Sequence, residues 1–465
     1  MSPTDPQNNL SRRFSRRSIL RFTLPSMAMM LCMSLYTIVD GIFVSRCVGT
    51  LALSALNMYF PYMGLMMGIA FMATAGGSAL IAARMGEGRA EEARRNFSAL
   101  MGILVGVGLL LTAAGLWGSE GLISLTGASE AQRPFLRDYL FWQFLLMPCL
   151  FLQIAYQTFF VTAGRPGLGL GISLAAGCTN MVLDYVLMVP LGMGVAGASL
   201  ATCAGWAVYT AAGAVFFARR GTSLRWARPA LPLRDLAALC GNGASEMVTS
   251  LALSVIGLLY NFSFMRLAGE DGVAALTVVF YFEFILTAFL FGFSNGISPV
   301  IAYKFGARDA VQLRFIVRTC FGFIAAGSLL AYLGSLLLKV PVLGIFLPPG
   351  SPVYRLASEG FPLYALSFLL IGTNIFTSSL FTALGNGVIS AIVSFTRTFF
   401  LLSACILLLP LWLGINGLWL AQTCAEFLAL FLSLFFLHTK LHLCPEKRRP
   451  RLPDLPGRAE IIENS

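Results

Sequence analysis

The chain has 465 residues, of which 57% are hydrophobic and only 11% are charged, and its mean hydropathy is +0.79. A soluble globular chain carries roughly 25% charged residues, so this composition excludes an ordinary soluble fold. Apolar runs of about 20 residues recur along almost the whole length, as is typical of a polytopic membrane protein. The loops between the runs are too short for a separate soluble domain, which argues against a sensor with such a domain.

The net charge of +11 follows a topological pattern. Of the 32 Lys and Arg residues, 24 lie in the two tails and the even-numbered loops, whereas 6 lie in the odd-numbered loops. This asymmetry is the positive-inside pattern, which predicts that both tails are cytoplasmic. We expect a multi-pass protein with the lipid bilayer as its partner and without nucleic acid, and the composition and the short tails favour a prokaryotic plasma membrane.

Twelve transmembrane spans are predicted in chain order. They cover residues 20–44, 55–83, 97–119, 138–163, 166–190, 195–218, 236–265, 273–303, 315–338, 359–384, 387–411 and 415–437. The chain then divides into an N-tail (1–19), a first lobe (20–218), a linker (219–235), a second lobe (236–437) and a C-tail (438–465). The even number of spans agrees with two tails on one side of the membrane.

The two halves are related by an internal repeat with an offset of 220 residues. Gly49 matches Gly269, Gly86 matches Gly306 and Pro190 matches Pro410 at this offset. Each half holds six spans, so both halves have the same orientation and an axis along the membrane normal relates them. The predicted fold class is an all-α integral membrane protein of twelve transmembrane helices in two six-helix lobes. Paired lobes around a central cavity favour a transporter that works by alternating access.

Ionisable residues inside the predicted spans are candidates for function. A charged side chain at bilayer depth costs at least about 2.5 kcal/mol, so it usually faces a cavity. The acids are Asp40, Asp184, Glu246, Glu283 and Glu426, and the base is Arg397. We expect Glu426 to pair with Arg397 across the last two spans and to serve structure. Glu246 and Glu283 are second-lobe candidates for function, with a structural role as the alternative.

Polar residues of the first lobe recur at helical spacing. Residues four apart lie on one helix face, and the residues concerned are Met33, Tyr36 and Asp40 in the first span, Tyr139, Gln143, Gln153 and Gln157 in the fourth, and Asn180 and Asp184 in the fifth. Such stripes would not face lipid, so we expect them to line one wet cavity. Tyr36, Met33, Tyr139, Gln143, Gln153 and Gln157 are the predicted substrate-cavity residues.

The chemistry of that cavity depends on Asp40 and Asp184. Two nearby carboxylates in a low dielectric do not both stay charged, so the pair can bind a proton, a sodium ion or an organic cation. Mutual exclusion of these ligands is what an antiporter needs. Asn180 and Thr202 could orient a carboxylate or complete an ion shell. The alternative is that neighbouring helices satisfy each acid and that both serve structure only.

Enzymatic chemistry has little support in the sequence. No Lys follows a Gly, so there is no Walker A motif and no sign of nucleotide binding. The 10 cysteines are scattered through apolar segments without a CxxC pair, and only His438 and His442 could join a metal site. We expect no catalytic group, no metal and no cofactor beyond a coupling ion.

Three segments carry a resemblance to a known family. They are Leu24-Pro25 with Leu35 to Val44, Gly164-Arg165-Pro166, and Pro190-Leu191 with Gly194 to Ala198. With the repeat, they resemble the MATE (multidrug and toxic compound extrusion) transporters, prokaryotic type. The resemblance implies a V-shaped fold that exports organic cations in exchange for H+ or Na+, and we expect it to act as a monomer.

The resemblance also assigns roles to residues. Asp40, Asn180, Asp184 and Thr202 match the family's first-lobe acidic cluster, Tyr36 and Tyr139 match aromatic residues near it, and Pro25 matches its bending proline. Glu246 resembles the acid of the sodium-coupled branch, but the tenth span has only Glu359, at its end. This departure favours protons over sodium. A flippase for lipid-linked sugars on a related fold is the alternative, although such proteins tend to have basic cavities.

Overall fold

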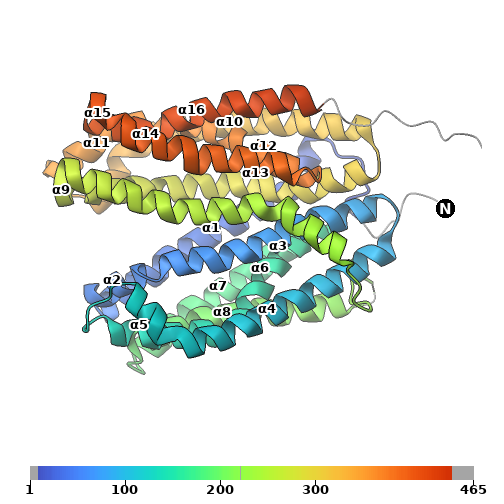
Figure 1. Cartoon of the computed structure of the whole chain (residues 1–465), viewed down its shortest axis with the longest axis horizontal. Helices are drawn as coiled ribbons and strands as arrows, with labels where there is room; N and C mark the ends of the chain where they lie inside the picture. Colours follow the sequence, from blue (N-terminus) through green and yellow to red (C-terminus); the bar gives the residue numbers. More distant parts are fainter. Residues whose placement is uncertain (1–8, 220, 442–465) are drawn as a thin grey trace, which may run out of the picture.

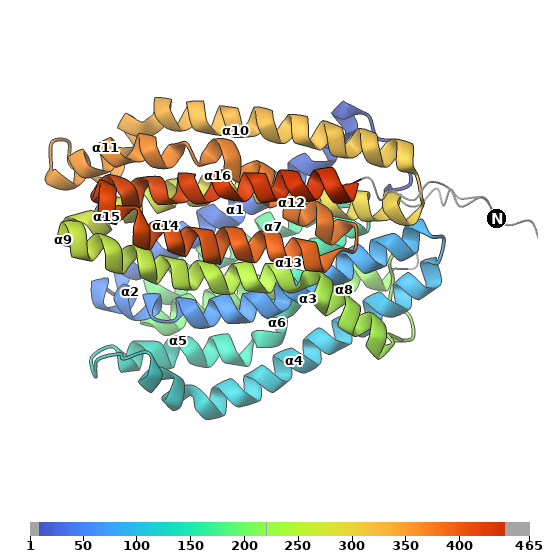
Figure 2. The same cartoon turned by 45° about the horizontal axis from the view of Figure 1, so that its top comes forward.

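The computed structural model describes residues 9–219 and 221–441. The first lobe contains α1 (Arg16–Cys47), α2 (Thr50–Asn57), α3 (Phe60–Gly86), α4 (Ala90–Leu125), α5 (Arg133–Leu145), α6 (Met147–Thr162), α7 (Pro166–Met188) and α8 (Gly194–Ala218). The second contains α9 (Leu233–Gly306), α10 (Ala310–Phe346), α11 (Pro352–Ala365), α12 (Phe368–Ala383), α13 (Gly387–Phe395), η1 (Thr396–Leu401), α14 (Leu402–Leu408), α15 (Pro410–Leu413) and α16 (Ile415–Lys440). The two lobes lie one above the other in Figure 1, and α10, α14 and α16 run along the second lobe in Figure 2.

The helices account for twelve membrane spans. Among the described residues, nine helices are long and apolar enough to span a membrane, and two bent pairs, α5 with α6 and α11 with α12, add two spans. The 74-residue α9 contains two spans, because Gly269 (φ 62°, ψ −153°) turns the chain between them. The predicted all-α fold in two six-span lobes is confirmed. Its predicted spans agree with the helices, except that some helices extend further or are broken.

The prediction of one continuous helix is wrong for two of the spans. The segment 138–163 bends by 59° between α5 and α6, and the segment 359–384 bends by 48° between α11 and α12. Pro148 explains the first bend, because it has no N–H for the carbonyl of Phe144 and its ring clashes there. Thr112 of α4 donates to that carbonyl instead, at 2.7 Å. The freed backbone group is therefore satisfied inside the membrane, as a lipid environment requires.

The main contact between the lobes is made by α1 and α3 of the first lobe with α9 of the second lobe. Glycines make this contact possible. A Cβ atom at Gly86 would lie 2.1 Å from the Tyr303 carbonyl oxygen, and one at Gly306 would lie 2.1 Å from the Ala83 carbonyl oxygen. The 220-residue offset relates Gly86 to Gly306 and Tyr303 to Ala83, so the two contacts are equivalent under the pseudo-two-fold axis. Small residues of this kind let transmembrane backbones approach closely.

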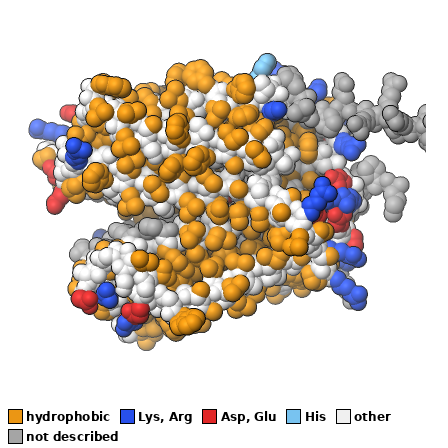
Figure 3. Space-filling model, in the orientation of Figure 1, with side chains coloured by type: hydrophobic (Ala, Val, Ile, Leu, Met, Phe, Trp, Pro, Cys, Tyr) orange, Lys and Arg blue, Asp and Glu red, His pale blue; other side chains and the backbone are white. Residues whose placement is uncertain are grey.

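The surface is divided into an apolar belt and two charged ends. Figure 3 shows hydrophobic side chains along the length of both lobes and charged groups gathered at the left and right ends. Large apolar side chains such as Trp117 and Leu110 are largely exposed, as expected of a lipid-facing surface. The lobes meet at the end that carries Gly86 and Gly306, and the surface is notched between them at the opposite end.

A segment before α1 crosses the closed end of the molecule. The Asn9 amide donates to the Gly164 carbonyl in the first lobe at 2.9 Å. The Lys304 ammonium of α9 donates to the Ser11 carbonyl at 3.0 Å, and the Phe14 N–H donates to Gln312 of α10 at 2.9 Å. Residues 9–15 therefore connect the two lobes, and we call them the strap.

Candidate functional site

The first-lobe acids lie in a buried polar cluster. Asp184 of α7 has no exposed surface, and neither of its carboxylate oxygens accepts a hydrogen bond from a described residue. Asp40 of α1 is partly exposed, and its Oδ1 is buried without a donor. Asp40 and Asp184 lie on α1 and α7, which pack against each other. The structure thus brings the two predicted acids together.

Amide and hydroxyl groups complete this cluster. The side-chain amide nitrogen of Asn180 donates to the Thr202 hydroxyl of α8 at 3.4 Å. The side-chain Oδ1 of Asn180 accepts no hydrogen bond from a described residue. The Oε1 atom of Gln153 is also buried without a donor, and its side chain lies against Tyr36. Buried oxygens without donors suit a proton or a hard cation, which both bind oxygen.

Local packing explains how these helices come so close. A Cβ atom at Gly205 of α8 would lie 3.2 Å from the Ala176 carbonyl and 3.6 Å from Asn180 Cβ. At Gly177 of α7 it would lie 3.5 Å from the Tyr36 ring. Gly177 and Gly205 therefore allow α1, α7 and α8 to pack closely around the cluster.

The remaining predicted cavity residues have different surroundings. Gln143 is fully buried, where its carbonyl accepts from Tyr59 at 3.3 Å and its amide donates to Ser199 at 3.3 Å. Tyr139 packs edge-on against Tyr59. Gln157 contacts Met33 through its amide and reaches the space between the lobes. The single stripe expected along the fourth span is interrupted, because the bend at Leu146 separates Gln143 from Gln153 and Gln157.

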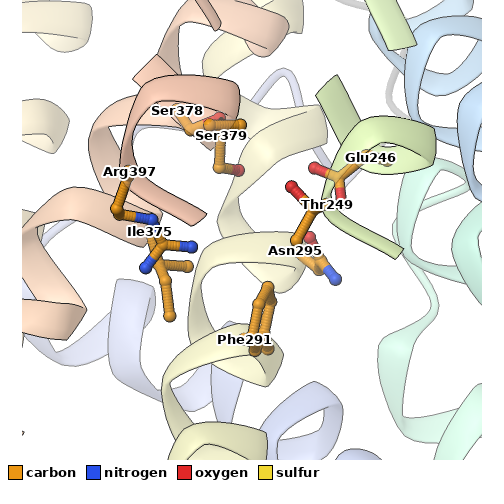
Figure 4. Close-up of a pocket in the computed structure, with 9 residues that line it drawn as sticks. Glu246, Thr249, Phe291, Asn295, Ile375, Ser378, Ser379 and Arg397 are labelled. Carbon is orange, nitrogen blue, oxygen red and sulfur yellow. Dashed lines mark hydrogen bonds between the residues drawn. The ribbon is translucent and has the colours of Figure 1, made fainter. Parts of the chain in front are cut away.

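Two cavities lie away from the acid pair. The larger lies between the lobes and has a volume of about 60 Å³, and we call it the central cavity. Its described lining includes Met29, Met30, Phe71, Gln157, Glu246 and Asn295. The smaller lies within the second lobe and has a volume of about 10 Å³, and we call it the side chamber (Figure 4). Of the two acids predicted for the first lobe, neither lines these cavities, whereas Glu246 lines both.

The second-lobe acids occupy three distinct environments. Glu246 faces the cavities, and Glu283 accepts a hydrogen bond from the Tyr364 hydroxyl at 2.5 Å. Glu426 accepts from Arg397 Nη1 at 3.0 Å, so the expected pair across the last two spans is present. Asn374 and Gln422 also donate to the Glu426 carboxylate, at 2.7 Å and 3.3 Å. Glu426 is therefore a buried, fully partnered carboxylate.

Sequence reasoning missed the polar face of α12. Asn374, Ser378 and Thr382 recur every four residues, so they lie on one face of this helix. Ser378 bonds to Ser394 at 2.7 Å and to Ser390 at 2.8 Å. The same helical spacing that identified the first-lobe stripes would have found this face.

Pro25 lies inside an unbroken α1, so its role as a hinge stays a prediction. No group of three or more Cys, His, Asp or Glu within residues 9–219 and 221–441 could hold a metal ion. Of His438 and His442, the two histidines that could join a metal site, His442 falls outside this part of the chain.

Comparison with known proteins places the chain in a family. The sequence profile of the MatE family matches residues 25–186 and 247–407, which together make up more than half of the chain and fall one in each lobe. The chain belongs to the MatE family. MatE proteins are membrane transporters, so this chain is a multi-pass membrane transporter.

Similar proteins include two curated relatives and a solved MATE structure. The chain is 22% identical over 440 residues to "Multidrug export protein MepA" of Staphylococcus haemolyticus, covering 91% of this chain and 93% of that protein. It is 24% identical over 340 residues to an "FAD transporter" of Shewanella oneidensis, covering 71% of this chain and 74% of that protein. A solved outward-facing conformation of a multidrug resistance MATE family transporter superimposes with a TM-score of 0.88 at 20% identity, covering 96% and 99% of the two chains. This MatE chain therefore has the MATE fold.

Proposed function

We propose that the chain is a secondary active exporter that extrudes organic cationic or amphiphilic compounds in exchange for protons. The observation that carries this proposal is the set of buried oxygens without donors on Asp184, Asn180 and Asp40. The printed name of the MepA relatives supports multidrug export as the class of activity. Protons rather than sodium remain our choice, because Glu359 is the one acid of the tenth span within α11 and α12, and its side chain is exposed.

The coupling follows from mutual exclusion at the acid pair. Asp184 has no exposed surface, whereas Asp40 is partly exposed, so a proton would reach Asp184 through Asp40. When the pair is protonated, it no longer attracts a cation, and the substrate is released. When the pair loses its proton, it draws a cation toward the first lobe. A proton gradient directed inward then drives export.

Alternating access would use the two lobes as rigid bodies. The lobes are packed together at the end that carries the strap and the basic even-numbered loops, which we assign to the cytoplasm on the positive-inside pattern. The notch at the opposite end would then face the outside, and the plasma membrane of a prokaryote is the proposed location. Rocking of the lobes about the central cavity would move the opening from one side to the other.

Efflux from proteoliposomes tests this proposal. The purified chain is compared with Asp40→Asn and Asp184→Asn, with a fluorescent rhodamine ester as the substrate and an imposed pH or sodium gradient. The exposed Glu130 offers a matched control, Glu130→Gln, which removes a surface carboxylate whose ion pair within the described part of the chain is with Arg133. We expect proton-driven efflux that both buried variants lose and the control keeps. No efflux from the native chain under either gradient would refute the proposal and favour a flippase.

A further inference from the structure

The strap, the first turns of α1 and the first turns of α10 meet at the closed end of the molecule. The Phe14 N–H of the strap donates to Gln312 of α10 at 2.9 Å. The Phe14 ring packs edge-on against Phe22 of α1, with the ring centroids 5.7 Å apart. Figure 2 shows the dark-blue start of the chain beside the right-hand end of α10. Segments of both lobes therefore lie within one side chain of each other at this place.

Two guanidinium groups lie near each other here without an acid. Arg12 lies over the ring of Phe14 at 4.9 Å and over that of Phe22 at 5.8 Å. Burial and, after it, the neighbouring Arg21 lower the pKa of the Arg12 guanidinium. Within residues 9–219 and 221–441, no carboxylate forms an ion pair with Arg12 or Arg21. Like charges repel, so an anion bound to both groups would be attracted by each.

The start of α1 carries an exposed face on which arginines alternate with leucines. Arg17, Leu20, Arg21 and Leu24 are all exposed, and their spacing places them on one side of the helix. Leu24 is 55% exposed although it lies inside a membrane span. This face therefore joins positive charge at the end of the span to apolar surface further along it, as the headgroup and acyl chain of a lipid require.

The start of α10 repeats this pattern. Val311, Arg314, Phe315 and Arg318 are exposed at the same helical spacing. Val311 is 80% exposed, and no carboxylate of a described residue pairs with either arginine. The exposed faces of α1 and α10 thus have the same composition on the two sides of the strap.

The internal repeat shows that this arrangement is particular to the second lobe. At the offset of 220 residues, Arg314 corresponds to Arg94 and Val311 corresponds to Glu91. In the first lobe, Arg94 pairs with Glu91 at 3.4 Å. The second lobe has an exposed valine in place of that acid, so Arg314 keeps a charge that its counterpart shares with a carboxylate. The common scaffold does not require this difference.

We call Arg12, Arg17, Arg21, Arg314 and Arg318 the basic band. We propose that the basic band binds the headgroup of an anionic membrane phospholipid, with Arg12 and Arg21 on its phosphate and with its acyl chains over the apolar residues of α1 and α10. The planar guanidinium matches the oxygens of a phosphate. The band lies at the end assigned to the cytoplasm, where the leaflet is negatively charged.

The location of the band gives the lipid a structural consequence. Arg12 lies in the strap, Arg21 in the first lobe and Arg314 in the second lobe. A lipid held by these groups would stabilise the state in which the lobes are packed together at this end. The inference concerns the membrane and not the exported compound, so it goes beyond the proposed export function.

Lipid binding to the purified full-length protein tests the site. Native mass spectrometry compares the affinities for phosphatidylglycerol and for phosphatidylcholine with the same acyl chains, because these lipids differ in headgroup charge. We expect the native chain to prefer phosphatidylglycerol. Arg12→Gln with Arg21→Gln should bind it at least about tenfold more weakly, since each arginine near a membrane surface contributes about fivefold. The control Arg228→Gln with Arg234→Gln removes two exposed arginines of the linker and should change the affinity much less.

A charge-compensating variant tests the band without removing an arginine, and it carries the test if the double variant does not fold. Val311→Glu gives Arg314 the acid that Arg94 has in Glu91, so it should weaken binding of phosphatidylglycerol. The control Val311→Gln adds no charge and should weaken it less. In nanodiscs, phosphatidylglycerol in place of phosphatidylcholine should slow amide hydrogen exchange in the strap of the native chain.

Three outcomes would overturn the proposal. The first is equal affinity of the native chain for the two lipids. The second is an equal loss of affinity in the double variant and in the linker control. The third is displacement of phosphatidylglycerol by millimolar inorganic phosphate, which would assign the band to a soluble anion instead of a lipid.

Discussion

Gly76 of α3 and Gly243 of α9 bring the backbones of the two lobes into direct contact. A Cβ atom at Gly76 would lie 1.9 Å from the Leu239 carbonyl oxygen, and one at Gly243 would lie 1.9 Å from the Met72 carbonyl oxygen. Neither position has room for a methyl group, and the neighbouring atoms are rigid backbone. The closed end of the transporter therefore depends on two glycines that are 167 residues apart in the sequence.

Substitution of Gly243 by Ala should open this end. Overpacking of this kind costs about 1–3 kcal/mol, which would shift the lobes toward the state that is open to the cytoplasm by about fivefold or more. Accessibility of an engineered cysteine in the central cavity, labelled from the cytoplasmic side, measures the shift. Gly241→Ala is the matched control, because no atom lies within 4 Å of a Cβ atom there. Equal labelling of both variants would contradict the proposed role of the glycine contact.

Removal of the Lys304 ammonium should weaken the strap. Its Nζ donates to the Ser11 carbonyl at 3.0 Å in a buried position, and a hydrogen bond from a charged group contributes about 1.5–3 kcal/mol. Lys304→Met keeps the length of the side chain and should raise amide hydrogen exchange in residues 9–15 by about tenfold. The control is Lys440→Met, at an exposed position. Unchanged exchange in the strap would show that Lys304 does not hold it.

Asp184→Asn should separate transport from stability. The amide has nearly the shape of the carboxylate, and neither oxygen of Asp184 accepts a hydrogen bond from a described residue, so no such bond is lost. We expect the free energy of unfolding to change by less than about 1 kcal/mol while proton-driven efflux disappears. Thermal unfolding and efflux of the same preparation measure both. A large loss of stability would instead assign Asp184 a structural role.

Thr112→Val should destabilise the bend between α5 and α6 by about 0.5–1.5 kcal/mol, because the Phe144 carbonyl would lose its donor. Pro148→Ala restores an N–H for that carbonyl, so Thr112→Val should cost less in its presence. The coupling energy from the double-mutant cycle, measured by thermal unfolding, checks this relationship. Additive effects would show that Thr112 does not substitute for the missing helix bond.

The first-lobe cluster shows how far helical spacing can go. Asn180 and Asp184 share a face of α7, and the polar character of that face predicted their burial near Asp40. Spacing could not show that Gln143 turns toward Tyr59 and Ser199, because the bend before α6 changes the direction of the helix. Spacing also could not show which residue of another helix donates to the Phe144 carbonyl that Pro148 leaves without a helix hydrogen bond; in the structure this residue is Thr112.

The amino-acid sequence by itself determined the membrane class, the twelve spans and the two-lobe repeat, and it singled out Asp40 and Asp184 as candidate site residues. Hydropathy and helical periodicity are local properties, so they can be read along the chain without knowledge of its neighbours. Only the tertiary structure decided the contact between Gly76 and Gly243, the course of the strap and the side chamber between Glu246 and Arg397. Each of these depends on which helix faces are in contact, and that choice is made by packing between residues far apart in the sequence.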